Sequence, residues 1–330
     1  MIKTILLTGD SHACGQGAVG FTVTDETEFG YDPFGRGIGR NMRMGGGDYI
    51  NLVRAEINRI TGSTASECTA DSLSAKYGLP LLHRCVKLTK AIMLECPADL
   101  LVVRFAENNT PASVKIEYAE NSRTETLCAD RLRYGKLSFR DIPIFCSGAP
   151  VVITPLSGEV LIDTVMSFSG SYAVIRQGVG SCHCLRFAED YYGDCVTPFT
   201  PHILIAEAHT INDWLTGCTP EVYGEHLSRL LGRMKQDCAH LHLLTVSPVA
   251  GSQDAPYNST PYNRFIEASR KTAAAMVIPM IDANAAMESA LAGLSKEERF
   301  ARLFADNWHV NDFGHKIYAD EIMKMIRPIL

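Results

Sequence analysis

The chain has 330 residues, of which 46% are hydrophobic and 21% are charged, and its formal net charge is −6. This length allows two domains, and the composition is that of a globular protein with a sizeable core. The acidic balance and the scattered Lys and Arg residues argue against nucleic acid or an anionic membrane as the main partner.

The N-terminal residues Met1 to Gly9 form a short apolar run with no small-residue cleavage site after it, so they predict a buried strand rather than a secretory signal. No apolar stretch is long enough to span a bilayer, which argues against membrane insertion. The odd count of 11 cysteines favours reduced thiols and a cytoplasmic location, while secretion after signal removal stays open. The oligomeric state is not readable from the sequence.

After a first strand at 2–8, a helix is expected near 48–60. Residues 65–170 then depart from the alternation of strands and helices that the rest of the chain shows. This middle region contains short, β-branched runs separated by turn residues, and several runs alternate apolar and polar positions. Such a pattern is typical of antiparallel strands and predicts an inserted β-sandwich-like domain. The runs are Leu100–Phe105, Ser113–Tyr118, Gly135–Phe139, Val151–Thr154 and Val160–Asp163.

From residue 171 onward, apolar runs alternate with helical patterns. Thr219 is the expected N-cap of a helix that has Pro220 in its first turn, Ser295 and Glu298 form a capping box, and Asn311 is a plausible N-cap of the last helix. The expected strands are 172–176, 203–206, 241–246 and 277–281, and the expected helices are 182–192, one from Thr219, 261–275, one from Ser295 and one from Asp312 to Ile326.

Five strands with intervening helices predict a three-layer α/β/α domain with a five-stranded parallel sheet. This domain is discontinuous and consists of 1–64 and 171–330, with 65–170 as the inserted accessory domain.

Two blocks at opposite ends of the chain could hold catalytic residues. Ser11 directly follows the first strand, where parallel sheets place their ligands, although Gly9, Asp10 and Ser11 are also ordinary turn residues. Near the other end, Asp306 precedes His309 by one turn and could orient it as a base. The alternative for the second block is a helix-capping loop with a surface histidine, a description that we apply to His315.

In this order and at these positions, the Gly9-Asp10-Ser11 and Asp306-x-x-His309 blocks resemble those of SGNH (GDSL-like) hydrolases. The resemblance implies a flavodoxin-like domain with a catalytic triad of Ser11, His309 and Asp306. It also implies an oxyanion hole made by the Ser11 amide, a glycine amide and an asparagine side chain. The chain departs from the family pattern at three positions, which are His12, Thr210 and Val310.

For the asparagine of the oxyanion hole, Asn212 after the strand at 203–206 is preferred to Asn108, which falls in the inserted region. For the glycine, Gly180 after the strand at 172–176 is preferred to Gly45–Gly47 before the first helix. Asp10 and Asp213 are interpreted as structural acceptors of backbone N–H groups. Trp214 and Trp308 could line a pocket or pack in the core.

The resemblance implies acyl transfer to Ser11 without a metal or organic cofactor, and a small-molecule or glycan ester as substrate. The run Cys182-His183-Cys184 is a weak metal pattern because it lacks a second ligand pair. The placement of the β insertion resembles that of accessory domains in carbohydrate esterases, so an O-acetyl group on a sugar is the first expectation. The alternatives are a lipase or lysophospholipase-type acylhydrolase, an acyltransferase, and a glycan-binding protein with a vestigial site.

Overall fold

The structure is a computed structural model that describes residues 1–21, 44–82, 84–95, 97–108, 110–128, 138–250 and 258–330. The chain divides into two compact units. The β-rich unit contains Ile57–Ala173 and Met1–Lys3, and the α/β unit contains Val174–Leu330 with the described residues 4–21 and 44–56. That the β-rich unit is a separately folding accessory domain stays a prediction.

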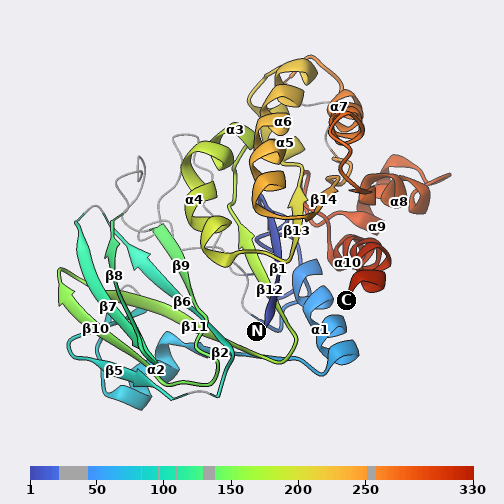
Figure 1. Cartoon of the computed structure of the whole chain (residues 1–330). Coiled ribbons are helices and arrows are strands. Elements are labelled where there is room, and N and C mark those ends of the chain that lie inside the picture. Colours follow the sequence, from blue (N-terminus) through green and yellow to red (C-terminus); the bar gives the residue numbers. More distant parts are fainter. Residues whose placement is uncertain (22–43, 83, 96, 109, 129–137, 251–257) are drawn as a thin grey trace. The chain divides into compact units, whose positions relative to one another are not determined.

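The α/β unit is built on a five-stranded sheet whose order is β12-β1-β13-β14-β15 (Figure 1). Three of its four pairs of neighbouring strands are parallel, and the bonds Lys3 N→Ser171 O and Val179 N→Gly9 O show that β1 and β12 also run in the same direction. In chain order the strands run 2-1-3-4-5, as in flavodoxin-like doubly wound sheets. The predicted parallel sheet of five strands is therefore confirmed. The strands are β1 (Lys3–Gly9), β12 (Tyr172–Gly178), β13 (Ile203–Glu207), β14 (His240–Leu244) and β15 (Met280–Ile281).

Helices cover this sheet in two groups. α1 (Tyr49–Thr61) packs on α10 (Asp312–Ile326), where the Tyr49 and His315 rings stack at 5.9 Å. The other group contains α6 (Pro220–Asp237) and α7 (Tyr262–Ala275), which pack on each other. Because the strand order reverses at β1, right-handed crossovers assign α1 to one face and α6 and α7 to the other.

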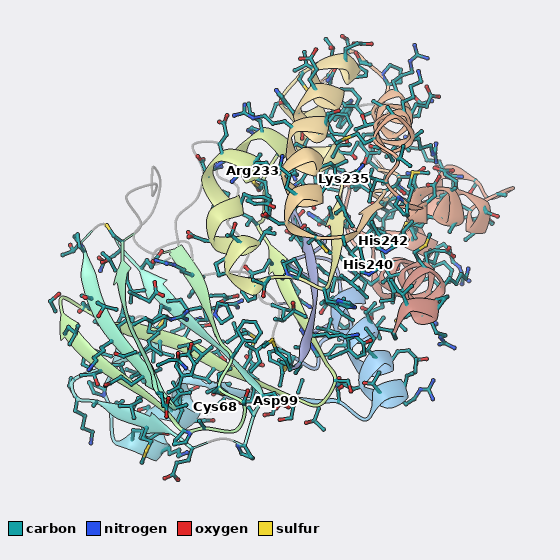
Figure 2. All side chains as sticks on the ribbon, in the orientation of Figure 1. Cys68, Asp99, Arg233, Lys235, His240 and His242 are labelled. Carbon is teal, nitrogen blue, oxygen red and sulfur yellow. The ribbon has the colours of Figure 1, made fainter. Side chains whose placement is uncertain are left out.

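Two residues of α6, Arg233 and Lys235, which Figure 2 labels, hold it to its neighbours. The Arg233 guanidinium lies over the Tyr192 ring at 4.1 Å, and Lys235 Nζ donates to the Met276 carbonyl at 2.8 Å. Tyr192 begins α4 (Tyr192–Cys195), which follows α3 (Cys184–Arg186) and the π-helical turn η1 (Phe187–Tyr191). The single helix predicted near 182–192 is thus segmented.

The predicted helix starts are confirmed at three positions. Thr219 caps α6, Asn311 caps α10 by accepting from two backbone N–H groups, and Ser295 and Glu298 form the capping box of α9 (Lys296–Leu303). The sequence patterns did not reveal α5 (Thr210–Leu215), α8 (Ala283–Ala290), η2 (Thr197–Phe199) or η3 (Arg327–Ile329). None of the helices in the described ranges combines the length and apolar character that a bilayer crossing requires.

The β-rich unit contains two antiparallel sheets, ordered β5-β10-β7-β8 and β3-β4-β11-β6-β9, with β2 paired to β11. It also has a helix that the sequence patterns did not reveal, α2 (Ala70–Tyr77). Part of the expected strand at 135–139 lies outside the described residues. The strands are β2 (Thr64–Thr69), β3 (Leu81–Leu82), β4 (Cys85–Lys87), β5 (Ile92–Leu94), β6 (Leu100–Glu107), β7 (Ala112–Tyr118), β8 (Asn121–Leu127), β9 (Ser138–Ile144), β10 (Val151–Ser157) and β11 (Leu161–Ser169).

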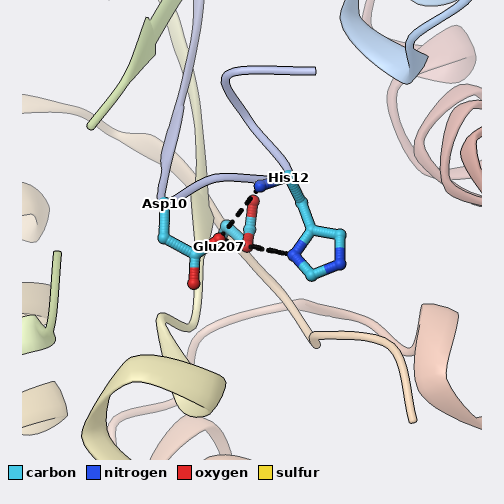
Figure 3. Close-up of side chains that lie close together, drawn as sticks. All are labelled: Asp10, His12 and Glu207. Carbon is cyan, nitrogen blue, oxygen red and sulfur yellow. Dashed lines mark hydrogen bonds and ion pairs between the residues drawn. The ribbon is translucent and has the colours of Figure 1, made fainter. Parts of the chain in front are cut away.

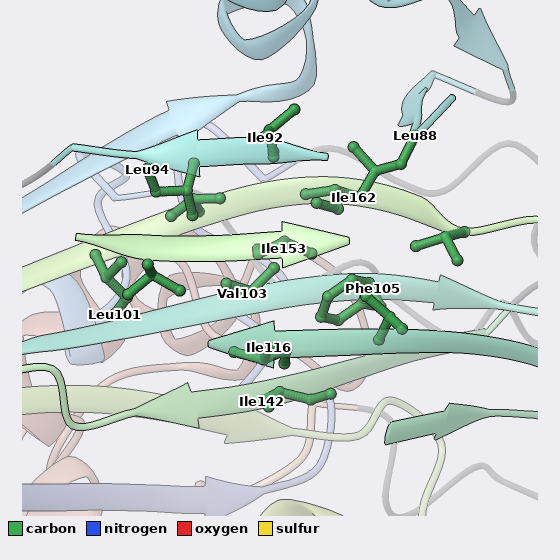
Figure 4. Packing of buried hydrophobic residues seen from close by; sticks show 14 of the residues in the cluster. Leu88, Ile92, Leu94, Leu101, Val103, Phe105, Ile116, Ile142, Ile153 and Ile162 are labelled. Carbon is green, nitrogen blue, oxygen red and sulfur yellow. The ribbon is translucent and has the colours of Figure 1, made fainter. Parts of the chain in front are cut away.

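Both antiparallel sheets contribute to one apolar core (Figure 4). Alternate residues of β6, namely Leu101, Val103 and Phe105, are buried together with Ile116 of β7 and Ile153 of β10. The two-residue period of a strand explains why these side chains gather on one face. The sheets of a β-sandwich bury their core in the same way.

Candidate active site

Ser11 lies in the turn that follows the carboxyl end of β1. The backbone N–H groups of Cys14 and Gln16 donate to the carbonyls of Asp10 and Ser11, both at 3.0 Å, so the segment forms a compact loop. Gly17 continues this loop with φ +95°. A Cβ at Gly17 would lie 2.1 Å from the Val310 carbonyl oxygen, so only glycine allows the loop to approach the segment that contains His309 this closely.

The loop before α10 places His309 against Ser11. Asp306 Oδ1 accepts the backbone N–H groups of Trp308 and His309, both at 2.8 Å, and Asp306 Oδ2 lies 2.8 Å from His309 Nδ1. Because a carboxylate only accepts, Nδ1 carries the ring proton and Nε2 is the acceptor. Nε2 lies 2.9 Å from Ser11 Oγ, so the serine hydroxyl donates to it.

The ionisation of Asp306 suits this arrangement. Burial alone would raise the pKa of Asp306, but the hydrogen bond and charge of His309, with the two backbone N–H groups, lower it to about 2. The carboxyl is therefore ionised at neutral pH and holds the imidazole in one tautomer and orientation. A serine, a histidine and an aspartate connected in this way can generate a nucleophile.

The loop after β13 brings Asn212 to the same place. Asn212 lies in α5 and is buried, and its Nδ2 donates to Asp10 Oδ2 at 2.7 Å. This bond uses one of the two N–H groups of the amide and leaves the other available. Asp213 accepts the backbone N–H of Cys184 at 2.8 Å, which is the kind of structural bond expected for it.

Gly180 lies in the turn after β12 and is buried. The residue before it, Val179, donates its backbone N–H to the Gly9 carbonyl at 2.9 Å, so this turn lies beside the carboxyl end of β1. The loops that follow β1, β12 and β13 therefore meet at one edge of the parallel sheet, as expected for a doubly wound fold.

The alternative candidates occupy other positions. Asn108 belongs to the β-rich unit, and its Oδ1 accepts the Thr110 N–H at 2.7 Å, which is typical of a turn residue. Gly47, two residues before the start of α1, donates its N–H to the Val19 carbonyl at 3.0 Å. Gly45 has φ +100°, which glycine adopts without strain.

His315 corrects the sequence interpretation, because it is buried rather than at the surface. Nδ1 accepts the Tyr49 N–H at 3.4 Å, and Nε2 lies 3.1 Å from the Gln16 carbonyl. Burial lowers the pKa of His315 to about 4. The ring is therefore neutral at pH 7, and it connects α1 with the loop that follows Ser11.

A buried polar cluster consists of Asp10 and His12, the two sequence neighbours of Ser11, and Glu207 of β13 (Figure 3). His12 Nδ1 lies 3.4 Å from Asp10 Oδ1 and 3.7 Å from Glu207 Oε1. On its other side His12 Nε2 lies 3.3 Å from Ser247 Oγ, and its ring centroid lies 5.3 Å from that of His309. Sequence reasoning missed this cluster. The signals that could have indicated it are His12 beside the nucleophile and an acidic residue directly after the apolar run 203–206.

The cluster is the one group of three possible metal ligands within the described part of the chain. The Cys182-His183-Cys184 run does not form such a group. Cys184 Sγ donates to the Ala208 carbonyl at 3.3 Å, and His183 caps α3. Burial raises the pKa of both thiols well above the usual range, which disfavours the thiolates that metals require.

Aromatic rings lie close together at the loop before α10, which contains Trp308 and His309. The Trp214 ring lies 6.1 Å from Trp308 and 5.6 Å from Tyr262. Trp214 is buried, whereas Trp308 lines a groove of about 1830 Å³ that α7, α8 and α9 also border. The groove lining mixes Trp308 and Phe300 with amide and charged side chains.

Neither a protein-family model nor a curated protein matches the sequence. Among solved structures, the chain is similar to LAE5, an alpha/beta hydrolase enzyme from the metagenome of Lake Arreo, Spain. The TM-score is 0.47 with 13% identity, over 98% of this chain and 94% of that one.

The chain is also similar to Axe2, an acetylxylan esterase from Geobacillus stearothermophilus, with a TM-score of 0.39 and 18% identity over 47% of this chain and 72% of that one. A third similar structure is described as a GDSL-like lipase from Parabacteroides merdae, with a TM-score of 0.38 and 17% identity over 46% and 72% of the two chains. All three descriptions name hydrolases or lipases. At these identities and TM-scores, the similarity carries no argument about function, so the function is argued from the side chains of this chain.

Proposed function

We propose that the protein is a serine esterase of the SGNH (GDSL-like) type. The observation on which this rests is the unbroken chain of contacts from Ser11 Oγ to His309 Nε2 at 2.9 Å and from His309 Nδ1 to Asp306 Oδ2 at 2.8 Å. His309 takes the proton of Ser11 as the hydroxyl attacks the ester carbonyl, and Asp306 stabilises the imidazolium that forms. The tetrahedral intermediate then collapses, the ester C–O bond breaks, and the imidazolium gives its proton to the leaving alcohol, which leaves acyl-Ser11 and a neutral His309. Water attacks the acyl carbonyl as His309 takes its proton, and the proton is finally returned to Ser11 Oγ when the acid product leaves.

The oxyanion of the tetrahedral intermediate is proposed to accept from the backbone N–H groups of Ser11 and Gly180 and from the side chain of Asn212. The bonds Val179 N→Gly9 O and Asn212 Nδ2→Asp10 Oδ2 support this proposal, because they hold the loops after β12 and β13 beside the loop that contains Ser11. Donors fixed before the reaction stabilise the developing charge without reorganisation.

The proposal extends to the domain architecture. Residues 1–64 and 171–330 form a flavodoxin-like, three-layer catalytic domain, and 65–170 form a β-sandwich-like accessory domain. The strand order of the parallel sheet and the shared core of the two antiparallel sheets support this division.

As substrate we propose an O-acetyl ester on a carbohydrate. The groove lined by Trp308, the residue before His309, supports this choice, because its lining mixes aromatic side chains with amides and charged groups. Sugars present apolar faces to aromatic rings and hydroxyl groups to polar side chains. A long acyl chain would need a more uniformly apolar lining.

The test compares the wild type with Ser11→Ala and His309→Ala on a p-nitrophenyl acetate assay, followed by acetylated oligosaccharides and long-chain esters. Each substitution is expected to lower kcat by at least about 10³-fold with the fold intact. Ser228→Ala is the matched control, since Ser228 Oγ donates only to the Gly224 carbonyl within α6.

The outcomes separate the alternatives. Full activity of Ser11→Ala would refute the proposed nucleophile. A preference for long-chain esters would indicate a lipase, and acyl transfer to added alcohol acceptors would indicate an acyltransferase. Binding of glycans without labelling of Ser11 by a fluorophosphonate probe would indicate a glycan-binding protein.

A further inference from the structure

Hydrogen bonds join the loop that follows β12 to the loop that follows β13. The Cys184 N–H donates to Asp213 Oδ2 at 2.8 Å, and Cys184 Sγ donates to the Ala208 carbonyl at 3.3 Å. A further bond connects His209 Nδ1 with the Cys182 carbonyl oxygen at 2.9 Å. The cysteine run that resembles a weak metal pattern in the sequence therefore connects two loops of the candidate site.

The bond of His209 has a defined direction. Because a carbonyl oxygen only accepts, His209 Nδ1 carries a proton and donates it to the Cys182 carbonyl. The ring is completely buried and lies 5.0 Å from the Phe187 ring. Its other nitrogen, Nε2, has no hydrogen-bond partner within the described part of the chain. The imidazole is therefore held in place through Nδ1.

The backbone of His209 has an uncommon conformation. Its φ of +53° and ψ of +19° lie in the left-handed region, and the residue is the N-cap of α5, where its carbonyl accepts the Asp213 N–H at 3.3 Å. Ser181, directly after Gly180, is also left-handed with φ +56°. Such conformations persist where surrounding contacts hold them, and they gather at functional sites. Here they occur in the two loops that the His209 bond joins.

The two loops are anchored to β1 in different ways. The turn that contains Gly180 is held to β1 through the backbone, because the Val179 N–H donates to the Gly9 carbonyl at 2.9 Å. Asn212 is the third residue of α5, and His209 directly precedes this helix. The bond from His209 therefore sets the start of α5 relative to the Gly180 turn. Oxyanion donors must converge on one point before the reaction, so this spacing matters for turnover.

We propose that His209 is a positioning residue that fixes the start of α5 by donating its Nδ1–H to the Cys182 carbonyl. The Asn212 amide is then held where it meets the same oxyanion as the Gly180 N–H. The inference rests on the proposed esterase function. Because His209 acts through Asn212 and only on the transition state, its loss lowers kcat and leaves KM nearly unchanged.

The experiment compares three substitutions of His209 that differ in their donor. Asparagine tolerates the left-handed backbone and places its NH₂ group as many bonds from Cα as Nδ1, whereas glycine tolerates the backbone without a donor. Glutamine fills more of the site but places its NH₂ group one bond further out, as Nε2. We expect His209→Gly and His209→Gln to lower kcat on p-nitrophenyl acetate by about 10- to 30-fold with KM within about twofold. His209→Asn should lose less than about threefold.

A double-mutant cycle shows whether His209 acts through Asn212. In the Asn212→Ala background, His209→Gly should lower the remaining kcat by less than about twofold, because the donor that it positions is already absent. His242→Ala is the matched control, since His242 is a buried histidine of β14 whose ring nitrogens have no hydrogen-bond partner among the described residues. It should keep the wild-type kcat. Thermal unfolding reports whether each variant folds, and if His209→Gly does not, His209→Gln against His209→Asn decides.

Four results would overturn the inference. They are a wild-type kcat in the folded Gly and Gln variants, an equal loss in the Asn and Gly variants, a loss from His209→Gly that is as large in the Asn212→Ala background as in the wild type, and a comparable loss in His242→Ala. Loss of hydrolysis in Ser11→Ala tests the proposed function separately, so a failed His209 inference leaves that function standing.

Discussion

Both units bury charged side chains, but they use them differently. In the β-rich unit, Arg104 of β6 and Asp141 of β9 face each other across paired strands and form two hydrogen bonds of 2.7 Å. In the α/β unit, the buried Asp10 follows β1 and the buried Glu207 ends β13, and both belong to one cluster with His12.

The difference separates structural from chemical use of buried charge. In a bidentate Arg–carboxylate pair, the two charged groups are hydrogen-bonded to each other within the sheet, so the pair has a structural role that needs no ligand. A carboxyl pair at strand ends, beside a serine and a histidine, keeps its pKa values apart and remains sensitive to its surroundings. The parallel sheet, at whose strand ends the two buried acids lie, is also the sheet that contains the candidate site.

The largest expected effect is on stability and concerns Asp141. Asp141→Ala leaves the Arg104 guanidinium buried without its carboxylate, so the free energy of unfolding should fall by about 3–5 kcal/mol. Urea titration measures the loss, and kcat of the folded fraction should stay at the wild-type value. A loss below about 1 kcal/mol would show that the pair is as dispensable as an exposed one.

A second prediction uses one asparagine from each unit. Asn212→Ala should lower kcat by about 10²- to 10³-fold, since it removes an oxyanion donor. Asn108→Ala removes only a turn bond to Thr110 and should leave kcat unchanged. Steady-state kinetics on p-nitrophenyl acetate decides between them, and the reverse order of effects would move the oxyanion donor to Asn108.

The smallest effect concerns an exposed apolar residue in each unit. Phe300 lines the groove and is 42% exposed, while Leu156 of β10 is 52% exposed. Phe300→Ala should raise KM for an acetylated oligosaccharide by roughly three- to tenfold, the equivalent of one modest aromatic contact. Phe300→Ala should leave KM for p-nitrophenyl acetate unchanged, and Leu156→Ala should leave KM for both substrates unchanged. Equal shifts on both substrates would exclude the groove as a sugar site.

Much of the parallel sheet and its helices could be predicted because apolar runs and helix caps depend on residues that are close together in the sequence. The apolar runs of β1 and β13 indicate strands buried on both faces, and the caps at Thr219 and Asn311 mark helix starts through bonds within three residues. In α6, Val222 is 39% exposed whereas its neighbour Tyr223 is buried. A helical period in the sequence does not determine which of two adjacent residues faces the core.

The candidate triad was predictable because its residues belong to short blocks, whereas the buried polar cluster was not. Glu207 continues an apolar run in the sequence, and its contacts with Tyr49 and His12 join segments far apart along the chain. The burial of His315 has the same origin, since Gln16 and Tyr49 enclose it from other elements. Such partners are set by tertiary packing, which a period or a cap does not encode.

Ser11 and His309, which are in contact, are 298 positions apart in the sequence, and this separation has a consequence during synthesis on the ribosome. At typical elongation rates the interval between synthesis of the two residues is roughly 15 to 60 s. During that time the nascent chain has its serine but no base to activate it. Under the proposed function, a chain released before residue 309 would lack its base, so acyl transfer would begin only once the segment that contains His309 has reached Ser11.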